Sequence, residues 1–382
     1  MTLKKMPYYK VAFRLRLLAA GIFFFAWAGP ASFSLAQTGK QAEWEKVLEA
    51  AKKERKVVVS IPTSAELRRE IERAFERRYG VDVEVFVARG SVGVRRIVEE
   101  HRAGVRYFDL HIGGSESVVT GLLPEGLLEP VEPWMILPEV KDPKNWWGGH
   151  IWVDNAKRYA YAFQAYQTEN LWYNSELMKP EEIRSFDDLL DPKWQGKFGL
   201  LDPRTPGSGA SIWSYLWHVK GEEYLKKFIG QKMLISRDQR LLAENLAKGR
   251  VSLVIGLTYY SFAPFVKAGL PVKPLPHPRE GVYVSGGSGH LTIIRNLPHP
   301  NATRLFVNWL LSKEGQEIFT RTMGQGTRRL DVDTKFLKEV GAVAAKDAGL
   351  TLEQYHKLEN QSENKINKIR KPAAALARKL LD

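Results

Sequence analysis

The feature that most constrains the fold is an alternation of strand-like and helix-like patterns between residues 57 and 115. Residues 57–62 are rich in β-branched side chains, and residues 81–88 alternate apolar and polar side chains, as strands do. Residues 65–80 and 91–103 repeat apolar side chains at helical spacing, and residues 109–112 form a third short strand pattern. A β-α-β-α-β order with short connections predicts a parallel, doubly wound sheet.

The loops that follow these strands are the expected ligand contacts, because ligands of doubly wound sheets lie beyond the carboxyl ends of the strands. These loops carry small hydroxyls, glycine and an arginine, and the candidates are Thr63, Ser64, Arg89, Ser91, Gly114 and Ser115. Residues 63–66 also have the pattern of a capping box at a helix start, which gives the hydroxyls there a purely structural alternative.

A second α/β pattern follows, with predicted strands at residues 197–201, 232–235, 251–255 and 272–275. A Gly/Ser-rich loop at residues 207–211 opens one of its helices, and such a turn presents free backbone N–H groups that bind anions. Two tyrosines follow the strand at residues 251–255, and Arg237 offers a fork for a carboxylate or phosphonate. The candidate contacts in this half are Ser208, Gly209, Ala210, Ser211, Arg237, Tyr259 and Tyr260.

Two long extended runs, residues 158–174 and 282–295, connect these patterns, and the second contains a Gly-rich break at residues 286–289. The expected fold class is therefore α/β, with two doubly wound α/β lobes joined by two extended hinge segments that let the lobes close over a ligand. The expected boundaries are residues 40–165 for the first part of lobe 1, 166–289 for lobe 2 and 290–382 for the return to lobe 1. Residues 340–382 are expected to be helical.

The first 36 residues predict a cleavable signal peptide. Five basic residues precede or enter an apolar run at residues 17–29, and small residues follow before Ala36. The apolar run is short for a membrane span, so we expect export to the periplasm rather than an anchor. Cleavage lowers the formal net charge from +14 to +9, which favours an anionic ligand. The chain has no cysteine, which excludes disulfides and thiolate chemistry.

The sequence favours binding over catalysis. The eight histidines show no zinc-ligand spacing, no nucleophile elbow surrounds a serine, and no phosphate-binding loop of an ATPase is present. His111 and His290 lie within predicted strands, so we interpret them as core or hinge residues. Basic residues alternate with acidic ones, as on solvated helix faces, so no nucleic-acid partner is expected. A secreted hydrolase using Ser208 or Ser211, and a chemoreceptor-linked binding protein, are the alternative functions.

Several blocks of sequence together resemble a known family. DLLDPKWQGKFGLLDPRTPGSGA at residues 188–210, VSLVIGLTYYS at residues 251–261, and residues 241–249, 286–319 and 327–334 are similar to extracellular solute-binding proteins of ABC importers, of the ferric-iron type. The resemblance covers roughly residues 40–335. It implies the type II periplasmic-binding-protein fold, a permease and an ATPase in the inner membrane as partners, and a monomeric binding component.

The resemblance also implies roles for two of the candidate groups. Tyr259 and Tyr260 match the adjacent tyrosines that hold Fe³⁺ in ferric binders, where phenolate is a suitably hard oxygen donor. Ser208, Gly209 and Ala210 match the turn that holds a companion anion. The first lobe lacks the His and Glu that some ferric binders carry, since Thr63, Ser64, Gly114 and Ser115 occupy those loops. Two ligands stay open: ferric iron, bare or chelated, as transported ligand, and a small organic anion such as a phosphonate or carboxylate. No resident cofactor is expected.

Overall fold

The computed structural model describes residues 31–382, so most of the predicted signal peptide lies outside the described residues. Contacts divide the chain into residues 1–42 and 43–382. The boundary falls within the first helix, α1 (Ala31–Glu54). Within the described residues, no helix combines the length and apolar character needed to cross a membrane. Residues 43–382 contain both sheets and the helices that cover them.

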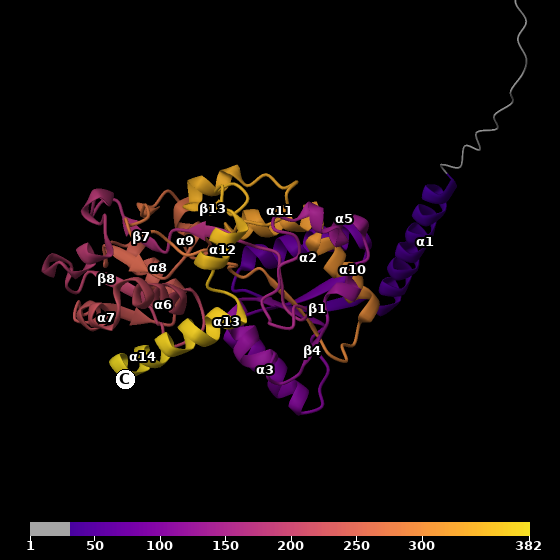
Figure 1. Ribbon diagram of the computed structural model, residues 1–382, viewed down its shortest axis with the longest axis horizontal. Helices are drawn as coiled ribbons and strands as arrows, with labels where there is room; N and C mark the ends of the chain where they lie inside the picture. Colours follow the sequence, from indigo (N-terminus) through magenta and orange to yellow (C-terminus); the bar gives the residue numbers. More distant parts are fainter. Residues whose placement is uncertain (1–30) are drawn as a thin grey trace, which may run out of the picture. The chain divides into compact units, whose positions relative to one another are not determined.

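The first sheet, whose strands β1 and β4 are labelled in Figure 1, has the strand order β2-β1-β3-β12-β4, and β5 also pairs with β12. Its core is parallel, since β1 pairs in parallel with both β2 and β3, whereas β12 runs antiparallel to β3. The prediction of a parallel sheet is therefore correct for the first three strands, and the sheet as a whole is mixed because β12 is antiparallel. The strands are β1 (Lys56–Ile61), β2 (Asp82–Val87), β3 (Leu110–Gly113), β4 (Leu128–Glu129), β5 (Tyr161–Ala162) and β12 (His290–Ile294).

The second sheet repeats this plan with the order β9-β8-β10-β7-β11. Strands β9, β8 and β10 are parallel, and β7 runs antiparallel beside β10. In each sheet the antiparallel neighbour of the parallel core comes from one of the two crossover segments. We call the elements of the first sheet lobe 1 and those of the second lobe 2. The strands of lobe 2 are β7 (Leu171–Asn174), β8 (Phe198–Leu201), β9 (Leu234–Ser236), β10 (Leu253–Ile255) and β11 (Val272–Pro274).

Helices cover both faces of each sheet because side chains of successive strand residues point to opposite faces. In lobe 1, Val57 and Val59 pack with α1, α2, α10 and α11, whereas Val58 packs with α3 on the other face. In lobe 2, Phe198 and Leu200 pack with α6 and α7, and Leu201 packs with α8 and α9. These helices are α2 (Ala65–Tyr79), α3 (Gly90–Arg102), α6 (Ser208–Lys220), α7 (Glu222–Ile229), α8 (Gln239–Ala247), α9 (Tyr259–Lys267), α10 (Pro300–Leu311) and α11 (Lys313–Met323).

Helix ends follow the local sequence closely. Ser64 caps α2 by accepting the Leu67 amide, and Gly80 ends the helix with φ of 65°, a conformation that glycine adopts without steric cost. The predicted capping box at residues 63–66 is wrong by one residue, since the third helical position is Leu67 and has no carboxylate. The start of α8 is capped in the same way, because the Asp238 side chain accepts the amides of Arg240 and Leu241.

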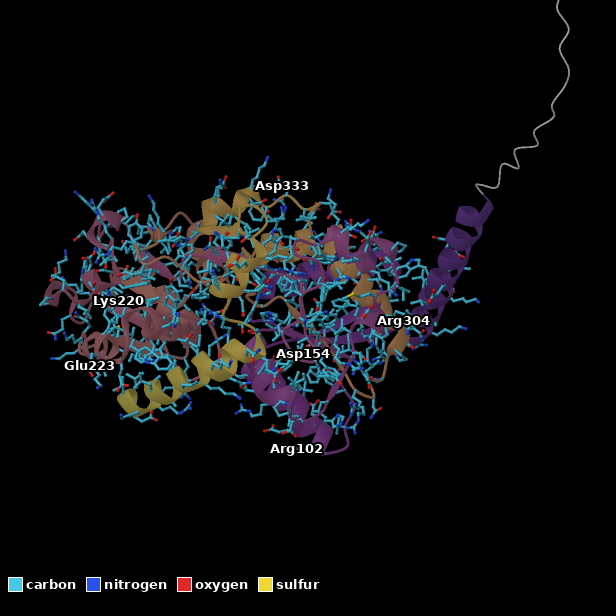
Figure 2. All side chains as sticks on the ribbon, in the orientation of Figure 1. Arg102, Asp154, Lys220, Glu223, Arg304 and Asp333 are labelled. Atoms are coloured by element: carbon cyan, nitrogen blue, oxygen red, sulfur yellow. The ribbon has the colours of Figure 1, made fainter. Side chains whose placement is uncertain are left out.

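Charged side chains such as those of Arg102 and Glu223 project from the helices (Figure 2). Many pair with an opposite charge, for example Arg102 with Glu125 and Glu223 with Lys226, each at 2.6 Å. This pairing agrees with the interpretation of interleaved charges as solvated helix faces.

The two crossover segments are not the continuous strands that the sequence predicted. The first is divided among β5, β6 (Tyr166–Thr168) and β7, because its residues bond to three different partners. Phe163 donates its amide to the Gly289 carbonyl, and Tyr166 exchanges both backbone hydrogen bonds with Ser285. The two crossovers therefore pair with each other where the chain passes between the lobes.

The C-terminal region differs from the expected helical return to lobe 1. It begins with a strand, β13 (Ala342–Ala344), paired with β6, and continues through α12 (Leu352–Leu358), α13 (Glu363–Lys365) and a π-helical turn, η8 (Ile366–Arg370). The last helix, α14 (Lys371–Leu381), packs against α6 in lobe 2 (Figure 1). Ala373, Leu376 and Ala377 are buried there, and the Trp213 indole donates to the Ala373 carbonyl at 2.9 Å. Residues 371–381 therefore pack with lobe 2.

Candidate ligand-binding site

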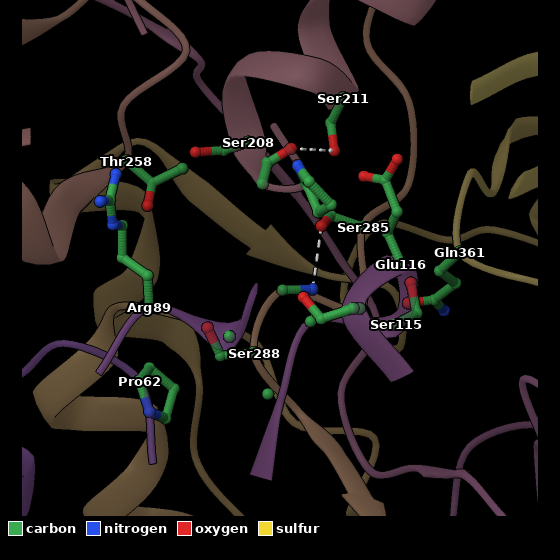
Figure 3. Close-up of a pocket in the computed structure, with 18 of the residues that line it drawn as sticks. Pro62, Arg89, Ser115, Glu116, Ser208, Ser211, Thr258, Ser285, Ser288 and Gln361 are labelled. Atoms are coloured by element: carbon green, nitrogen blue, oxygen red, sulfur yellow. Dashed lines mark hydrogen bonds between the residues drawn. The ribbon is translucent and has the colours of Figure 1, made fainter. Parts of the chain in front are cut away.

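A cavity lies between the lobes at the carboxyl ends of the parallel strands, as expected for such sheets. Including its open mouth, it measures about 1040 Å³. Lobe 1 contributes the loops after β1, β2 and β3, lobe 2 contributes the loop before α6 and the end of β10, and both crossovers line it. Figure 3 shows hydroxyl-bearing side chains from these segments converging, among them Ser115, Ser208, Thr258 and Ser288.

The first turn of α6 lies at the cavity wall. Gly207 precedes the helix with φ of 150°, and no side chain caps it. Ser211 donates both its amide and its hydroxyl to the Gly207 carbonyl. The Ser208 hydroxyl donates to the Gly256 carbonyl. Among the described residues, the amides of Ser208, Gly209 and Ala210 have no hydrogen-bond acceptor. The turn thus offers the unpaired N–H groups that an anion requires.

Lobe 1 faces this turn with three of the predicted loops. Thr63, Arg89, Gly114 and Ser115 all line the cavity. The Arg89 guanidinium crosses to lobe 2 and donates to the Arg237 carbonyl at 2.7 Å, so it connects the lobes at the mouth.

Three tyrosines line the cavity: Tyr166, Tyr260 and Tyr283. Tyr166 and Tyr283 are buried, and Tyr283 donates to the Asn170 side chain at 3.0 Å. Burial raises the pKa of each phenol, that of Tyr283 to about 12 and that of Tyr166 well above its usual range. All three therefore act as neutral hydroxyls unless a bound cation removes the proton.

Among the described residues that line the cavity, the two acidic side chains are both paired with arginine. Arg370 donates to Glu116, and both side chains are buried. Asp202 accepts from Arg204 at 2.9 Å and from Arg237 at 3.0 Å. Burial raises the pKa of the Asp202 carboxyl, but these arginine hydrogen bonds outweigh it and hold the pKa below its ordinary value. Neither carboxylate is left free to attract a cation.

The histidines near the cavity are structural. His290 lies 2.9 Å from the Gly113 carbonyl through Nδ1 and 3.0 Å from the Gln361 side-chain oxygen through Nε2. Burial lowers the pKa of both His290 and His111 to about 4, so both are neutral. The described part of the chain contains no group of three His, Cys, Asp or Glu residues that could hold a metal ion.

Six of the predicted contacts lie outside the cavity lining. Ser64 is the cap of α2, and Gly209 and Ala210 are buried behind the α6 turn, although the backbone amides of this turn belong to the site. Ser91 lies in a shallow groove along α3, and Arg237 is largely exposed while it pairs with Asp202. Tyr259 points away, packing on Gly324 and near Trp172. Tyr259 and Tyr260 therefore do not face the cavity together.

Sequence reasoning missed other lining residues: Glu116, Tyr166, Thr258, Tyr283, Ser285, Ser288, Asn360, Gln361 and Arg370. Thr258 was within reach of sequence analysis, because it lies three residues after a predicted strand and directly before Tyr259. Its buried hydroxyl has no partner among the described residues. Glu116 lies beside the predicted Ser115 in the segment after β3. The others come from the crossovers and the C-terminal region, where no local pattern marks a cavity wall.

Two sheets of like topology, joined by paired crossovers with a polar cavity between them, define the class of type II periplasmic binding proteins. Solved structures agree. Iron-bound HitA from Pseudomonas aeruginosa aligns with a TM-score of 0.63 at 18% identity, over 86% of this chain and 99% of HitA. AfuA from Actinobacillus pleuropneumoniae, with bound fructose-6-phosphate, gives 0.62 at 19% identity, over 85% and 98%.

The family follows from the sequence comparison. The model of the bacterial extracellular solute-binding protein family matches residues 56–322, and the chain belongs to that family. A Haemophilus influenzae protein of uncharacterised function is 26% identical over 254 residues, which is 64% of this chain and 70% of that protein. The protein is thus a bacterial extracellular solute-binding protein, the coarser part of what the resemblance implied.

Proposed function

We propose that this protein captures a small organic anion in the cavity between its lobes and delivers it to an ABC permease. The observation that carries the proposal is the first turn of α6, whose unpaired amides meet the cavity beside arginine and hydroxyl side chains. Because Glu116 and Asp202 are both paired with arginine, the remaining free groups are mainly hydrogen-bond donors. Such a wall favours oxygen acceptors carrying negative charge.

Ferric iron is the second candidate, favoured by the three phenols that line the cavity. HitA is described with iron and AfuA with fructose-6-phosphate, so relatives of this fold accommodate both kinds of ligand. Against bare iron, burial raises the pKa of the phenols, and Tyr259, one of the two expected ligands, points away. Iron would have to bring a chelating anion to complete its coordination.

The proposed cycle takes place in the periplasm, after removal of a signal peptide ending near Ala36. The monomer binds its solute, the lobes close, and the permease with its ATPase recognises the closed form. Contacts between the lobes, such as Lys267 with Glu66 at 2.8 Å, contribute little by themselves because both side chains are partly exposed. Ligand that touches both lobes therefore provides the differential affinity for the closed state.

We propose that the protein is not an enzyme and holds no resident cofactor. Ser208 and Ser211, the serines of the alternative hydrolase, donate their hydroxyls to backbone carbonyls rather than to a histidine. His290, the one histidine that lines the cavity within the described residues, has both ring nitrogens engaged elsewhere. Neither serine has the base that nucleophilic attack requires.

Thermal unfolding in the presence of candidate ligands tests the proposal. Inorganic phosphate, fructose 6-phosphate and citrate serve as anions, fructose as the uncharged control, and ferric chloride and ferric citrate as iron sources. At 100 times Kd, a ligand of the folded state adds about 2.7 kcal/mol of stability, enough to raise Tm by several degrees. We expect an anion to do so while fructose does not. A visible absorption band of iron–phenolate, with no anion response, would overturn the anion proposal.

A further inference from the structure

The C-terminal segment passes from the core of lobe 1 to the core of lobe 2 beside the cavity. Ile366 is fully buried in the lobe 1 cluster that contains α3, and Ala373, Leu376 and Ala377 are buried in the lobe 2 cluster that contains α6. Arg370 lies between these two anchors and lines the cavity. Its position is therefore fixed by both lobes.

The Arg370 guanidinium is almost fully buried but only partly satisfied. The residue is 5% exposed. Its Nη2 donates to Glu116 and, at 3.2 Å, to the Gly207 carbonyl, and its Nη1 makes a long contact of 3.5 Å with the Asn360 carbonyl. Its Nε is buried and has no hydrogen-bond partner among the described residues. Buried donors are nearly always paired, so this one calls for an acceptor.

A second unpaired donor lies on the same segment. The Asn360 side chain also lines the cavity, and its Nδ2 is buried with no partner in the described part of the chain. Leaving a buried donor unsatisfied costs about 1–3 kcal/mol. Two such donors on one wall, with Arg370 in contact with the α6 turn through Gly207, mark a place for a group that only accepts hydrogen bonds.

We propose that Asn360 and Arg370 bind the oxyanion of the ligand, together with the amides of the α6 turn. The inference rests on the proposed function and adds the ligand's chemical class: a solute with a carboxylate or phosphate group, whose oxygens accept from Nδ2 of Asn360 and Nε of Arg370. Glu116 occupies Nη2 and so holds the guanidinium in place. The C-terminal segment is thus part of the binding site and sets its preference for acidic ligands.

Two substitutions with matched controls test the assignment. Asn360→Asp keeps the side-chain shape but replaces the donor with a charged acceptor, and Asn367→Asp makes the same change at an exposed position of the same segment. Arg370→Lys keeps the charge that pairs with Glu116 but removes Nε, and Arg378→Lys is its exposed control on α14. Because neither test variant removes the pairing of Glu116, both are expected to fold, which Tm without ligand verifies.

Affinity is measured by calorimetry with inorganic phosphate, fructose 6-phosphate and citrate. A hydrogen bond to a charged group is worth about 1.5–3 kcal/mol, so Arg370→Lys should weaken binding of the preferred anion roughly 10- to 100-fold. Asn360→Asp should weaken binding at least as much, and the affinities of the two control variants should stay within about twofold of that of the unaltered protein. If the unaltered protein binds an anion and all four variants bind it equally, the inference fails while the proposed function stands. If it binds none of the three anions, both fail.

Discussion

Replacement of Gly209 by alanine probes how closely α6 must approach the sheet for its first turn to reach the cavity. A Cβ at this position would lie 2.3 Å from the Leu201 carbonyl oxygen and 2.9 Å from its carbon, both backbone atoms of β8. Ordinary contact begins near 3.4 Å, so the helix start must retreat by about 1 Å. Such overpacking typically costs about 1–3 kcal/mol.

The expected result of Gly209→Ala is a Tm lower by roughly 2–6 °C and a weaker affinity for the anion, by about tenfold. The affinity falls because the amides of residues 208–210 move with the helix start, although the substitution removes no donor. Thermal unfolding without ligand gives the first quantity, and calorimetry with the best anion of the panel gives the second.

Gly114→Ala is the control, because Gly114 has φ of −71° and only a distant neighbour at 3.8 Å. It should leave Tm without ligand unchanged or slightly raised, since alanine reduces the freedom of the unfolded chain. A Gly209→Ala protein with unaltered Tm and unaltered anion affinity would refute the reasoning, because α6 would then tolerate displacement from β8.

Two further perturbations test the C-terminal helix and the buried histidine. Leu376→Ala should lower the free energy of unfolding in urea by about 2–3 kcal/mol, because the side chain is only 8% exposed in the lobe 2 core. The control Leu352→Ala changes a side chain that is 45% exposed and should cost under about 0.5 kcal/mol. Equal losses in the two variants would contradict the packing of α14 on lobe 2. Burial lowers the pKa of His290 to about 4. The contribution of neutral His290 to the free energy of unfolding is therefore complete above pH ~6.5 and is lost as pH falls towards 4, because the unfolded state binds the proton first. His290→Asn should therefore reduce the fall in urea stability between pH 7 and pH 4.5 by at most about 3 kcal/mol; an unchanged pH dependence would show that His290 titrates normally.

Local sequence determined the elements and much of the cavity. Apolar spacing predicted the parallel strands and their helices, and glycine at position 80 predicted a helix end, because both depend on neighbours within a few residues. The fold rule that places ligands at strand ends then selected Thr63, Arg89, Gly114, Ser115, Ser208, Ser211 and Tyr260, which the structure brings together around the cavity.

The sequence pattern did not predict in which direction the side chains at the helix starts point. Tyr259 and Tyr260 are adjacent, but successive residues of a helix are rotated by about 100°, so the start of α9 sends Tyr260 to the cavity and Tyr259 towards Gly324. A shift of one residue in the helix start would place Tyr259 where Tyr260 now lies. Sequence alone does not fix that position to within one residue.

Only the tertiary structure decided which distant segments complete the site. Arg370 meets Glu116 and Gly207, which lie 254 and 163 residues away in the chain, and Tyr166 faces the cavity because the two crossovers pair with each other. Contacts of this kind arise from the packing of the C-terminal segment across both lobes and from the pairing of the crossovers, and they leave no periodic trace in the residues that make them. The sequence therefore determined the strands, the helices and the loops at their ends, whereas the arrangement of these parts in space decided which polar groups stay unpaired and ready for a ligand.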